Sequence, residues 1–339
     1  MTTLDEPPAQ PFPVVIGPTA GGKSTLAIDL ARRLAAGALP GFGPGEIVTA
    51  DSMQVYRGMD IGTAKPTPAE RSGVPHHLID IREPSEAFSV DEWLGMAEAT
   101  IADILARGGT PIVVGGSLLY AKAFLEGLFE GPPADDALRS ELEGLDPQER
   151  RRMLETVDPE AAIRIHPNDL RRTIRALEVH RLTGQPISDL QRQWESGATR
   201  PGAVVIGLEW PTEALNRRIN ARVKAMIDDG LLEEVGDLWL AGKLGRQARE
   251  ALGYKQFVEE FEKDPRLAER GRRTAAIEAA IEAVKIETRR FAKNQRTWLR
   301  RLKAVHAGCW LESATIPPEQ WVEQALDRLR LESERSGSS

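Results

Sequence analysis

The chain has 339 residues, of which 41% are hydrophobic and 28% are charged. This composition is near the average for soluble globular proteins and excludes a chain that is disordered or fibrous over most of its length. Because 44 basic residues face 51 acidic ones, for a net charge of -7, contact with nucleic acid has to come from local basic patches.

Membrane and secretory classes are also excluded by the sequence pattern. No run approaches the roughly 18 uninterrupted apolar residues that a membrane span needs. The first residues lack the basic-then-apolar order of a signal peptide. Cys309 is the single cysteine, so an internal disulfide and a cysteine-rich zinc site are ruled out. We expect a cytoplasmic protein that has no contact with membranes and acts as a monomer.

Short apolar runs rich in valine and isoleucine, each followed by turn residues, indicate parallel strands buried on both faces. These runs are 13–17 (PVVIG), 46–50 (EIVTA), 77–81 (HLIDI), 111–115 (PIVVG) and 204–208 (VVIGL). Helical patterns at 24–36 and 90–107 lie between the first four runs. The alternation predicts an α/β fold, with a parallel sheet flanked by helices like that of P-loop NTPases.

The strand pattern is missing between residues 131 and 200, where the sequence indicates several helices. It is helical again after the fifth run. We therefore expect two structured parts and two tails, the last of them fraying over 331–339. The expected parts are a flexible tail at 1–12, a catalytic core formed by 13–130 and 202–310, a helical insertion domain at 131–201, and a C-terminal helix with a flexible tail at 311–339.

A glycine-rich segment between the first strand and the first helix predicts a phosphate-binding loop. It matches G-x-x-x-x-G-K-[ST] in the structural context that the motif requires. Its residues are Gly17, Pro18, Thr19, Ala20, Gly21, Gly22, Lys23 and Ser24. The glycines let backbone N–H groups surround phosphate oxygens, Lys23 adds a cation, and the Ser24 hydroxyl suits Mg²⁺. The loop alone does not distinguish ATP or GTP from another diphosphate ester, and the alternative is a turn without a ligand.

Asp51 directly follows the second predicted strand. Ligands of open α/β sheets gather at the carboxyl ends of the strands, so Asp51 is expected within reach of the phosphate-binding loop. There it can accept a proton, orient a nucleophile or hold Mg²⁺ through water. The alternative is a carboxylate that only caps its own turn.

A basic segment at 285–303 is expected to form a helix with two distinct faces. Its apolar face would use Phe291, Trp298 and Leu302 to anchor the helix to the core. The cationic stripe one residue further on consists of Lys285, Arg289, Lys293, Arg296, Arg300 and Lys303. A continuous stripe of this kind is typical of contact with a phosphate backbone, and the alternative is a solvated helix face.

Two further arginine groups stand out. Arg171, Arg172 and Arg175 lie in the expected insertion, where they can contact a nucleic acid or form ion pairs with Glu178 and Asp169.

The second group follows the fifth strand. Arg218 and Arg222 lie four residues apart on one helix face, so one of them can clamp a diphosphate while the other is solvated.

From about residue 14 to residue 302 the chain resembles the tRNA dimethylallyltransferases, also called tRNA isopentenyltransferases. The matching segments are GPTAGGKS at 17–24, ADSMQVYRGMDIGTAKP at 50–66, PHHLIDI at 75–81, VVGGSLLY at 113–120, NDLRRTIRALEV at 168–179, LGYKQ at 252–256 and TRRFAKNQRTWLRR at 288–301. A shared phosphate-binding loop would be weak evidence, whereas this ordered set is highly specific.

The resemblance implies an activity: transfer of a dimethylallyl group from dimethylallyl diphosphate to N6 of the adenine 3′-adjacent to the anticodon in tRNA. It implies that the loop holds this diphosphate with Mg²⁺, whose ligand is Ser24, and that Asp51, Thr19 and Arg222 are catalytic. Its tRNA-contacting positions correspond to Asp51, Ser52, Met53, Gln54, Val55, Ser117, Arg139, Arg171, Arg172, Thr173, Ile174 and Arg175. Arg289, Lys293 and Arg296 of the cationic stripe would add contacts to the anticodon stem-loop.

Three other functions remain open. An adenylate isopentenyltransferase would use the same donor and a free adenine nucleotide, but would not need the basic helix. A P-loop phosphotransferase would place residues 150–175 over ATP as a lid, yet Asp80 is the single clear candidate for its Mg²⁺ carboxylate. A non-catalytic tRNA binder would leave Thr19, Lys23 and Asp51 unexplained.

Overall fold

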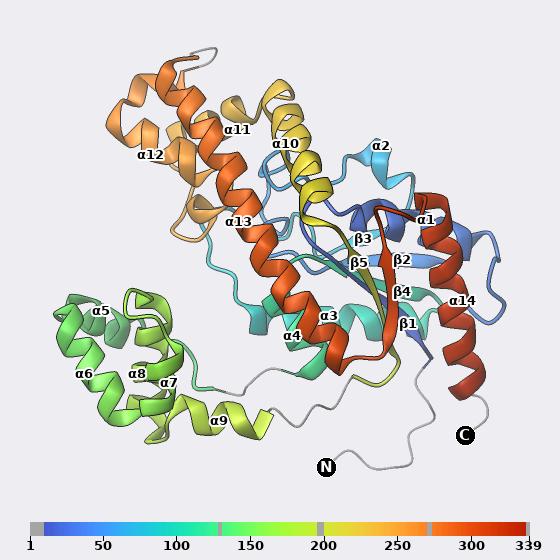
Figure 1. Cartoon of the computed structure of the whole chain (residues 1–339), viewed down its shortest axis with the longest axis horizontal. Coiled ribbons are helices and arrows are strands. Elements are labelled where there is room, and N and C mark those ends of the chain that lie inside the picture. Colours follow the sequence, from blue (N-terminus) through green and yellow to red (C-terminus); the bar gives the residue numbers. More distant parts are fainter. Residues whose placement is uncertain (1–9, 128–130, 195–199, 270–272, 337–339) are drawn as a thin grey trace. The chain divides into compact units, whose positions relative to one another are not determined.

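Six parallel strands form one sheet in the order β3-β2-β4-β1-β5-β6 (Figure 1). The computed structural model describes residues 10–127, 131–194, 200–269 and 273–336. The strands are β1 (Phe12–Ile16), β2 (Gly45–Thr49), β3 (His76–His77), β4 (Thr110–Gly115), β5 (Ala203–Glu209) and β6 (Gly308–Glu312). β1, β2 and β4 are buried along their whole lengths, as parallel strands covered on both faces must be. The predicted α/β fold with a parallel sheet is confirmed.

The strand order brings the ends of three strands together. β1 lies between β4 and β5, with Ile16 beside both Gly115 and Gly207. β2 pairs with the other side of β4, where Thr49 lies beside Val114. The loops that follow β1, β2 and β4 therefore leave the sheet at the same carboxyl edge, which is where open α/β sheets bind ligands.

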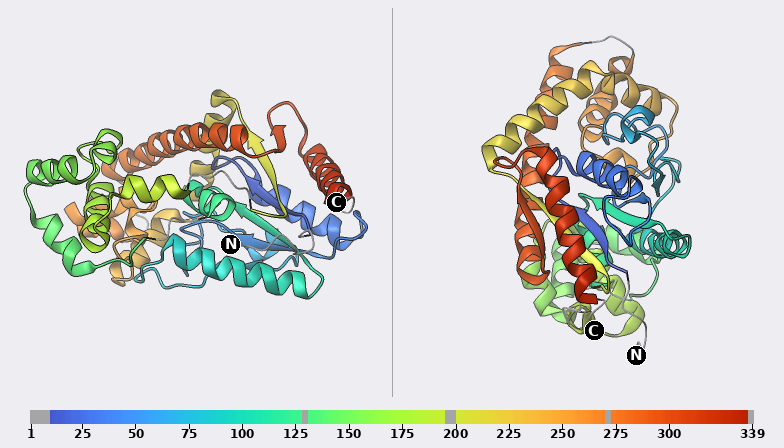
Figure 2. Two further views of the ribbon diagram at one scale, coloured as in Figure 1. Left: turned by 90° about the horizontal axis from the view of Figure 1, so that it is seen from below. Right: turned by 90° about the vertical axis from the view of Figure 1, so that its right-hand side faces the viewer.

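Two strand predictions were wrong. The third strand was expected at 77–81, but β3 ends at His77 because Leu78 and Asp80 have positive φ angles of 60° and 56°, which an extended strand does not allow. β6 was not predicted, because its sequence GCWLE has no run of branched apolar residues. It pairs with β5 at one edge of the sheet, and α14 (Pro318–Ser336) packs beside it (Figure 2).

Helices cover both faces of the sheet in the first of two compact units, which comprises Met1–Leu125 and Arg200–Ser339. Alternate strand residues enter different hydrophobic clusters. Val14 and Ile16 belong to the larger cluster, and Val15 belongs to the smaller one beneath α1 and α14. The other helices of this unit are α1 (Lys23–Ala35), α2 (Pro68–Arg71), α3 (Val90–Ala106), α4 (Leu118–Glu126), α10 (Thr212–Asp228), α11 (Leu231–Leu240), α12 (Lys255–Lys263) and α13 (Ala275–Val305), with short 3₁₀ helices at Ala248–Glu250 and Pro265–Ala268.

The ends of the chain are more ordered than expected where the structure describes them. Phe12 is buried in β1, so the predicted tail at 1–12 extends too far. Its residues 1–9 lie outside the described part. Residues 331–336, expected to fray, continue α14, while 337–339 are again outside the described part.

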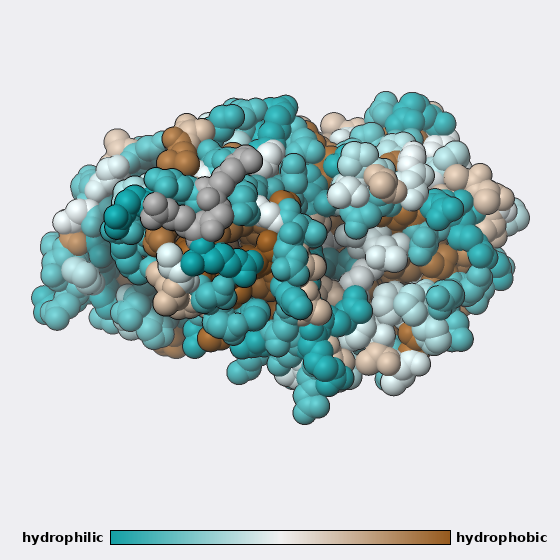
Figure 3. Space-filling model, turned by 90° about the horizontal axis from the view of Figure 1, so that it is seen from above, coloured by the Kyte–Doolittle hydropathy of each residue, from teal (hydrophilic) through white to brown (hydrophobic). Residues whose placement is uncertain are grey.

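No helix in the described ranges is long and apolar enough to cross a membrane. One face of the molecule, shown in Figure 3, is predominantly hydrophilic with smaller hydrophobic groups between.

The second compact unit is helical and comprises Glu126–Thr199, where the sequence analysis places an insertion at 131–201. Its helices are α5 (Asp136–Gly144), α6 (Pro147–Val157), α7 (Pro159–Arg164), α8 (Leu170–Thr183) and α9 (Ile187–Trp194). Aspartates cap the first four of these helices at their N-termini by accepting backbone N–H groups, which is the usual way to satisfy those donors. The unit has a hydrophobic cluster of its own around Leu142, Leu154 and Leu177.

A buried ion-pair group crosses the second unit. The fully buried Glu178 carboxylate accepts hydrogen bonds from Arg139 at 2.8 and 3.0 Å, from Arg175 at 2.6 Å and from the Asp135 amide at 2.9 Å. Burial raises the pKa of Glu178, but these hydrogen bonds outweigh it and hold the pKa below its usual range. The group therefore stabilises the unit at neutral pH.

We expect Glu178→Gln to destabilise the second unit by about 1–3 kcal/mol, because the change removes the charge from a buried carboxylate that two arginines face. Since the folded pKa is depressed, this stabilisation is present above the usual glutamate pKa and is lost as the pH falls through the folded value. Hydrogen exchange of α5 and α8 measures it. Glu141→Gln, which removes an exposed pair with Arg181 at 3.6 Å, is the control and should change little.

Candidate active site

A cavity of about 1100 Å³ lies at the carboxyl edge of the sheet in the first unit. Its walls come from eight separate segments of the chain. They are 19–32, 47–54, 62–66, 70–76, 114–117, 218–226, 250–253 and 284–295, each contributing some or all of its residues. The volume is at the upper end of the roughly 300–1,000 Å³ of small-molecule sites, so the cavity can hold more than a diphosphate.

The predicted phosphate-binding loop connects β1 to α1 and opens onto this cavity. The Gly21 amide donates to the Pro18 carbonyl at 3.1 Å, which closes the loop into a tight turn. Gly22 has a φ of 94°, a left-handed conformation that favours glycine, and α1 begins at the next residue. The free N–H groups at the start of α1 and its dipole therefore favour an anion at this position.

Side chains from α10, from α14 and from the residue that follows β5 support the loop. The indole of Trp210 donates to the Gly21 carbonyl at 3.0 Å, and Trp321 packs against Gly22. Arg218 donates to the Ala20 carbonyl at 2.8 Å while its guanidinium lies 4.5 Å from the Trp210 ring centre. The sequence analysis expected Arg218 either to bind a diphosphate or to be solvated. In the structure it supports the backbone of the phosphate-binding loop.

Lys23 and Arg222 form the cationic part of the cavity wall. The Lys23 ammonium donates to the Pro18 carbonyl at 2.9 Å, and burial together with Arg222 lowers the pKa of Lys23 to about 8 against the opposing effect of Asp51. Burial also lowers the pKa of Arg222. Within the described residues Arg222 forms no ion pair. Crowded cations of this kind favour the binding of a multiply charged anion.

Asp51 lies across the same cavity, and both interpretations of this residue fit its geometry. Its Oδ1 accepts hydrogen bonds from the amides of Met53 at 2.9 Å and Gln54 at 3.4 Å, so it caps its own turn. In the described part of the chain its Oδ2 has no hydrogen-bond donor. The cap fixes the carboxylate, and the second oxygen is available to a ligand in the cavity.

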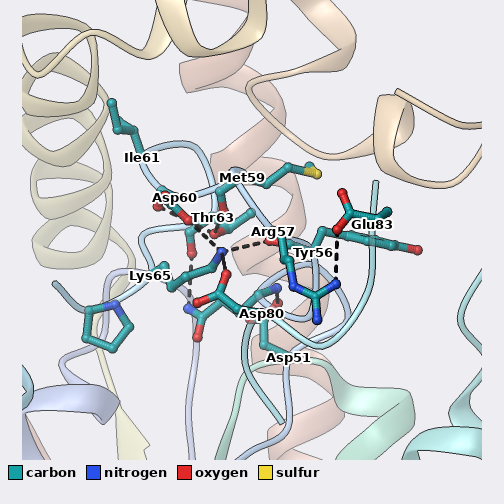
Figure 4. Close-up of polar contacts among 12 residues, drawn as sticks. Asp51, Tyr56, Arg57, Met59, Asp60, Ile61, Thr63, Lys65, Asp80 and Glu83 are labelled. Atoms are coloured by element: carbon teal, nitrogen blue, oxygen red, sulfur yellow. Dashed lines mark hydrogen bonds and ion pairs between the residues drawn. The ribbon is translucent and has the colours of Figure 1, made fainter. Parts of the chain in front are cut away.

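The loop that carries Asp51 is braced by a buried lysine that the sequence analysis did not identify. The Lys65 ammonium contacts Asp60 and Asp80 at 2.6 Å each and the Tyr56 carbonyl at 2.7 Å (Figure 4). Only 3% of its side chain is exposed. Lys65 therefore ties Tyr56 and Asp60, in the segment after Asp51, to Asp80 in the turn that follows β3.

A second brace comes from α11. The carboxylate of Glu234 accepts the successive amides of Asp60, Ile61 and Gly62 at 2.8–3.1 Å, and the Tyr254 hydroxyl donates to it as well. Glu234 gave no sequence signal for this role, because its backbone partners lie more than 170 residues away in the chain.

The positions near Asp51 that were predicted to contact tRNA separate into two groups. Ser52, Met53 and Gln54 line the cavity together with Ser117, whose hydroxyl accepts the Ser52 amide at 3.1 Å. Val55 is different, because its side chain is fully buried in the core and does not face the cavity.

The predicted tRNA contacts in the second unit also differ in accessibility. Arg171 and Arg172 are exposed, and Arg172 lies 3.5 Å from Asp169. Thr173 and Ile174 are buried in the unit's core. Arg139 and Arg175 bind Glu178, as described above. Arg172 and Arg175 thus form the ion pairs that the sequence analysis gave as the alternative to contact with a nucleic acid. Arg171 and Arg172 are exposed, so an RNA can still reach these two residues.

The long helix α13 corrects one prediction. Phe291 and Trp298 do not anchor it, since they are 42% and 38% exposed, whereas Leu302 is buried as expected. The buried face passes through Ala292 and Leu299, one residue after Phe291 and Trp298, and meets the predicted face at Leu302, because spacings of three and four fit both sets. Its buried residues are Ile277, Ala280, Ile281, Val284, Ala292, Gln295, Leu299 and Leu302. Phe291 instead lines the cavity.

The predicted cationic stripe is not uniformly free. Lys285, Arg289, Arg296, Arg300 and Lys303 each donate to another side chain. Lys293 is exposed and, within the described residues, has no hydrogen bond or ion pair. It is the member of the stripe most accessible to a phosphate.

Two observations bear on metal ions and on ATP. The described residues hold no cluster of three or more histidine, cysteine or acidic side chains that could bind a metal. Asp80, the candidate Mg²⁺ carboxylate of a phosphotransferase, contacts Lys65 at 2.6 Å and Arg71 at 3.7 Å and is not among the residues lining the cavity. The geometry gives no support to a phosphotransferase.

A phosphate-binding loop that faces a carboxylate across one cavity defines a P-loop α/β enzyme acting on a phosphate ester. The chain belongs to the IPP transferase family, whose sequence model matches residues 54–302.

Individual relatives agree with this assignment. The tRNA dimethylallyltransferase of Geobacillus thermodenitrificans is 42% identical over 94% of this chain and 98% of its own length. The crystal structure of the tRNA isopentenylpyrophosphate transferase of Bacillus halodurans matches with a TM-score of 0.68 and 36% identity, over 97% of this chain and 98% of that one. A eukaryotic dimethylallyltransferase whose structures show it acting on tRNA matches with a TM-score of 0.74 and 28% identity, over 94% and 77%.

Proposed function

We propose that this chain transfers the dimethylallyl group of dimethylallyl diphosphate to N6 of the adenine 3′-adjacent to the anticodon in tRNA, and releases diphosphate. The observation that supports it best is that Lys23, Arg222 and Asp51 line one cavity, close enough for their charges to interact. Leaving-group stabilisation and proton removal need these opposite charges within one site.

The leaving group is the part of the reaction that the phosphate-binding loop serves. As the bond between the allyl carbon and the bridging oxygen breaks, its electron pair moves onto the diphosphate. Lys23, Arg222 and the N-terminus of α1 stabilise this charge, and the Thr19 hydroxyl, which also lines the cavity, donates to the bridging oxygen. Without this stabilisation the diphosphate would leave far more slowly, which explains the need for a cationic site.

The attacking nitrogen is the part that Asp51 serves. The exocyclic amine of adenine is a weak nucleophile, and it gains positive charge as the new N–C bond forms. The Oδ2 atom of Asp51 accepts the proton that this nitrogen loses. A stacked base does not reach the cavity, so the adenine has to be flipped out of the anticodon loop.

We expect Mg²⁺ to bind at this site mainly through the oxygens of the diphosphate, with few ligands from the protein. Ser24 lines the cavity with its hydroxyl exposed, and Mg²⁺ commonly uses one or two protein ligands together with phosphate oxygens and water. Bound there, the ion would neutralise charge on the diphosphate.

The tRNA is expected to contact the Asp51–Gln54 turn with Ser117, the exposed Arg171 and Arg172, and Lys293 of α13. We propose that the protein acts as a monomer in the cytoplasm, where tRNAs are found.

Lys293 gives a direct test of the RNA surface. We expect Lys293→Gln to weaken binding of an anticodon stem-loop and to reduce the slope of log K against log salt by about 0.7–0.9, the value for one lost phosphate contact. Lys243→Gln, an exposed lysine outside the stripe and the cavity, is the control. An unchanged slope for Lys293→Gln would make this part of α13 a solvated face.

The function itself is tested by incubating the purified protein and Mg²⁺ with labelled dimethylallyl diphosphate, offering an unmodified anticodon stem-loop and AMP in separate reactions. Label in the RNA alone supports the proposal. Label in AMP alone indicates an adenylate isopentenyltransferase. Label in neither, together with consumption of ATP when ATP is offered in a third reaction, indicates a phosphotransferase.

A further inference from the structure

A buried glutamine on α13 connects the phosphate-binding loop to the turn that follows β4. Gln295 is 1% exposed. Its Oε1 accepts the Thr19 amide of the phosphate-binding loop at 2.8 Å, and its Nε2 donates to the Gly116 carbonyl after β4 at 2.7 Å. α13 is described over its whole length, and Gln295 alone among its buried residues is polar. A buried amide is tolerated because both of its ends are paired.

The connection continues from Gly116 to the turn that carries Asp51. Ser117 follows Gly116 directly, and its hydroxyl accepts the Ser52 amide at 3.1 Å. A path of short contacts thus runs from Thr19 through Gln295 and Ser117 to the residue after Asp51.

Packing leaves little freedom along this path. A Cβ added at Gly116 would lie 3.1 Å from the Lys23 ammonium and 3.2 Å from the Gln295 amide nitrogen, so the turn after β4 is pressed between the two side chains. Gln295 also occupies the Thr19 amide, which is then not free to donate to a phosphate. Thr19 presents its hydroxyl to the cavity instead.

We propose that Gln295 is a positioning residue that sets the separation between the diphosphate cradle and the Asp51 carboxylate. This inference rests on the proposed function, because it assigns the two ends of the path to leaving group and nucleophile. Gln295 does not touch the reacting atoms. A displacement of about 1 Å between reacting groups lowers rates by up to about 100-fold, while each substrate still finds most of its own contacts.

Two substitutions separate the contributions of its two ends. Gln295→Met keeps the length of the side chain and removes both hydrogen bonds. Gln295→Glu keeps the acceptor for the Thr19 amide but turns a carboxylate oxygen towards the Gly116 carbonyl, which repels it. For Gln295→Met we expect kcat for the stem-loop to fall about 10- to 100-fold, with KM for dimethylallyl diphosphate and Kd for inorganic pyrophosphate within about 3-fold of wild type. Gln295→Glu should lower kcat at least as much and also weaken pyrophosphate binding, because its carboxylate lies beside the Lys23 ammonium.

The chain contains a matched control. Gln247 also bonds the main chain with both ends of its amide, accepting the Phe88 amide at 3.1 Å and donating to the Phe88 carbonyl at 3.0 Å, and it does not line the cavity. Gln247→Met therefore removes the same two kinds of hydrogen bond elsewhere in the first unit. It is expected to lower Tm as the Gln295 variants do, with kcat unchanged.

Hydrogen exchange tests the connection without any prenyl transfer. In Gln295→Met, but not in Gln247→Met, peptides covering 17–24 and 115–118 should exchange faster than in the wild type. Unchanged exchange in both peptides would overturn the inference, whatever the activity of the wild type. Faster exchange with an unchanged kcat would also overturn it, because the glutamine would then be only structural. A wild type that leaves the stem-loop unlabelled would instead refute the proposed function.

Discussion

Asp51→Asn is expected to lower kcat for the anticodon stem-loop by about 100-fold or more, because the variant cannot accept the proton from the attacking amine. The fold of the turn should survive. An asparagine oxygen can still accept the amides of Met53 and Gln54, which the Oδ1 of Asp51 holds at 2.9 and 3.4 Å. Single-turnover kinetics with saturating donor and RNA measure the chemical step apart from binding.

Binding of the diphosphate should not weaken in this variant. The Asp51 carboxylate raises the pKa of Lys23 and of Arg222, so its removal leaves the cavity more positive. We expect the Kd of inorganic pyrophosphate to stay the same or decrease. A loss of pyrophosphate affinity together with kcat would show that the substitution disturbs the cradle and not the proton transfer.

Asp146→Asn is the matched control for the turn geometry. Asp146 caps α6 with the same pattern, accepting the amides two and three residues later at 2.8 and 3.3 Å, and it lies in the second unit away from the cavity lining. Asp146→Asn should leave kcat within about 2-fold of the wild-type value. Full activity of Asp51→Asn beside an unaffected Asp146→Asn would remove Asp51 from the chemistry.

The sequence predicted most of the sheet, and it predicted that the phosphate-binding loop and Asp51 lie close together, as they do in the lining of one cavity. Buried parallel strands have continuous apolar runs, and the phosphate-binding loop and Asp51 follow two of them directly, so local patterns carry this information. β6 was not predicted, because its sequence GCWLE lies at an edge of the sheet and is only partly buried, so it lacks a continuous apolar run. The third strand ended early because two residues with positive φ interrupt a segment whose composition still resembles a strand.

The supports of the site were less accessible to sequence reasoning. Lys65, Glu234 and Gln295 act through backbone atoms that are 9 to 276 residues away, and hydrogen bonds to the main chain leave no pattern in side-chain types. The apolar face of α13 was misplaced by one residue for a related reason. Phe291 and Trp298 are large and hydrophobic, yet the cavity and the surface, not the core, lie on their side of the helix. Gln295 is the one polar residue among the buried residues of this helix.

Lys23→Met is expected to weaken inorganic pyrophosphate binding by about 100-fold, since it removes a charge-assisted contact from an enclosed site. The pH dependence tests the same residue. With the pKa of Lys23 lowered to about 8, the free enzyme loses this charge as the pH rises through that value, so wild-type affinity should fall there. Calorimetry across this range measures it, and Lys23→Met supplies the baseline, because only the ligand's own protonation remains in that variant.

Stability should respond in the opposite direction to binding. The folded pKa of Lys23 lies below its unfolded value of 10.5, so its charge costs stability at pH values below about 8, and this cost disappears as the pH rises through 10.5. Lys23→Met should therefore raise Tm of the ligand-free protein at pH 7. Lys65→Met is the contrasting variant: it takes the ammonium from between Asp60 and Asp80 and should lower Tm at the same pH. If Lys23→Met instead lowered Tm while pyrophosphate affinity stayed unchanged, Lys23 would be a structural residue of the loop. We expect Lys23→Met to be more stable than the wild type and to bind the diphosphate poorly. This combination indicates a cation whose function is to bind the ligand and not to stabilise the fold.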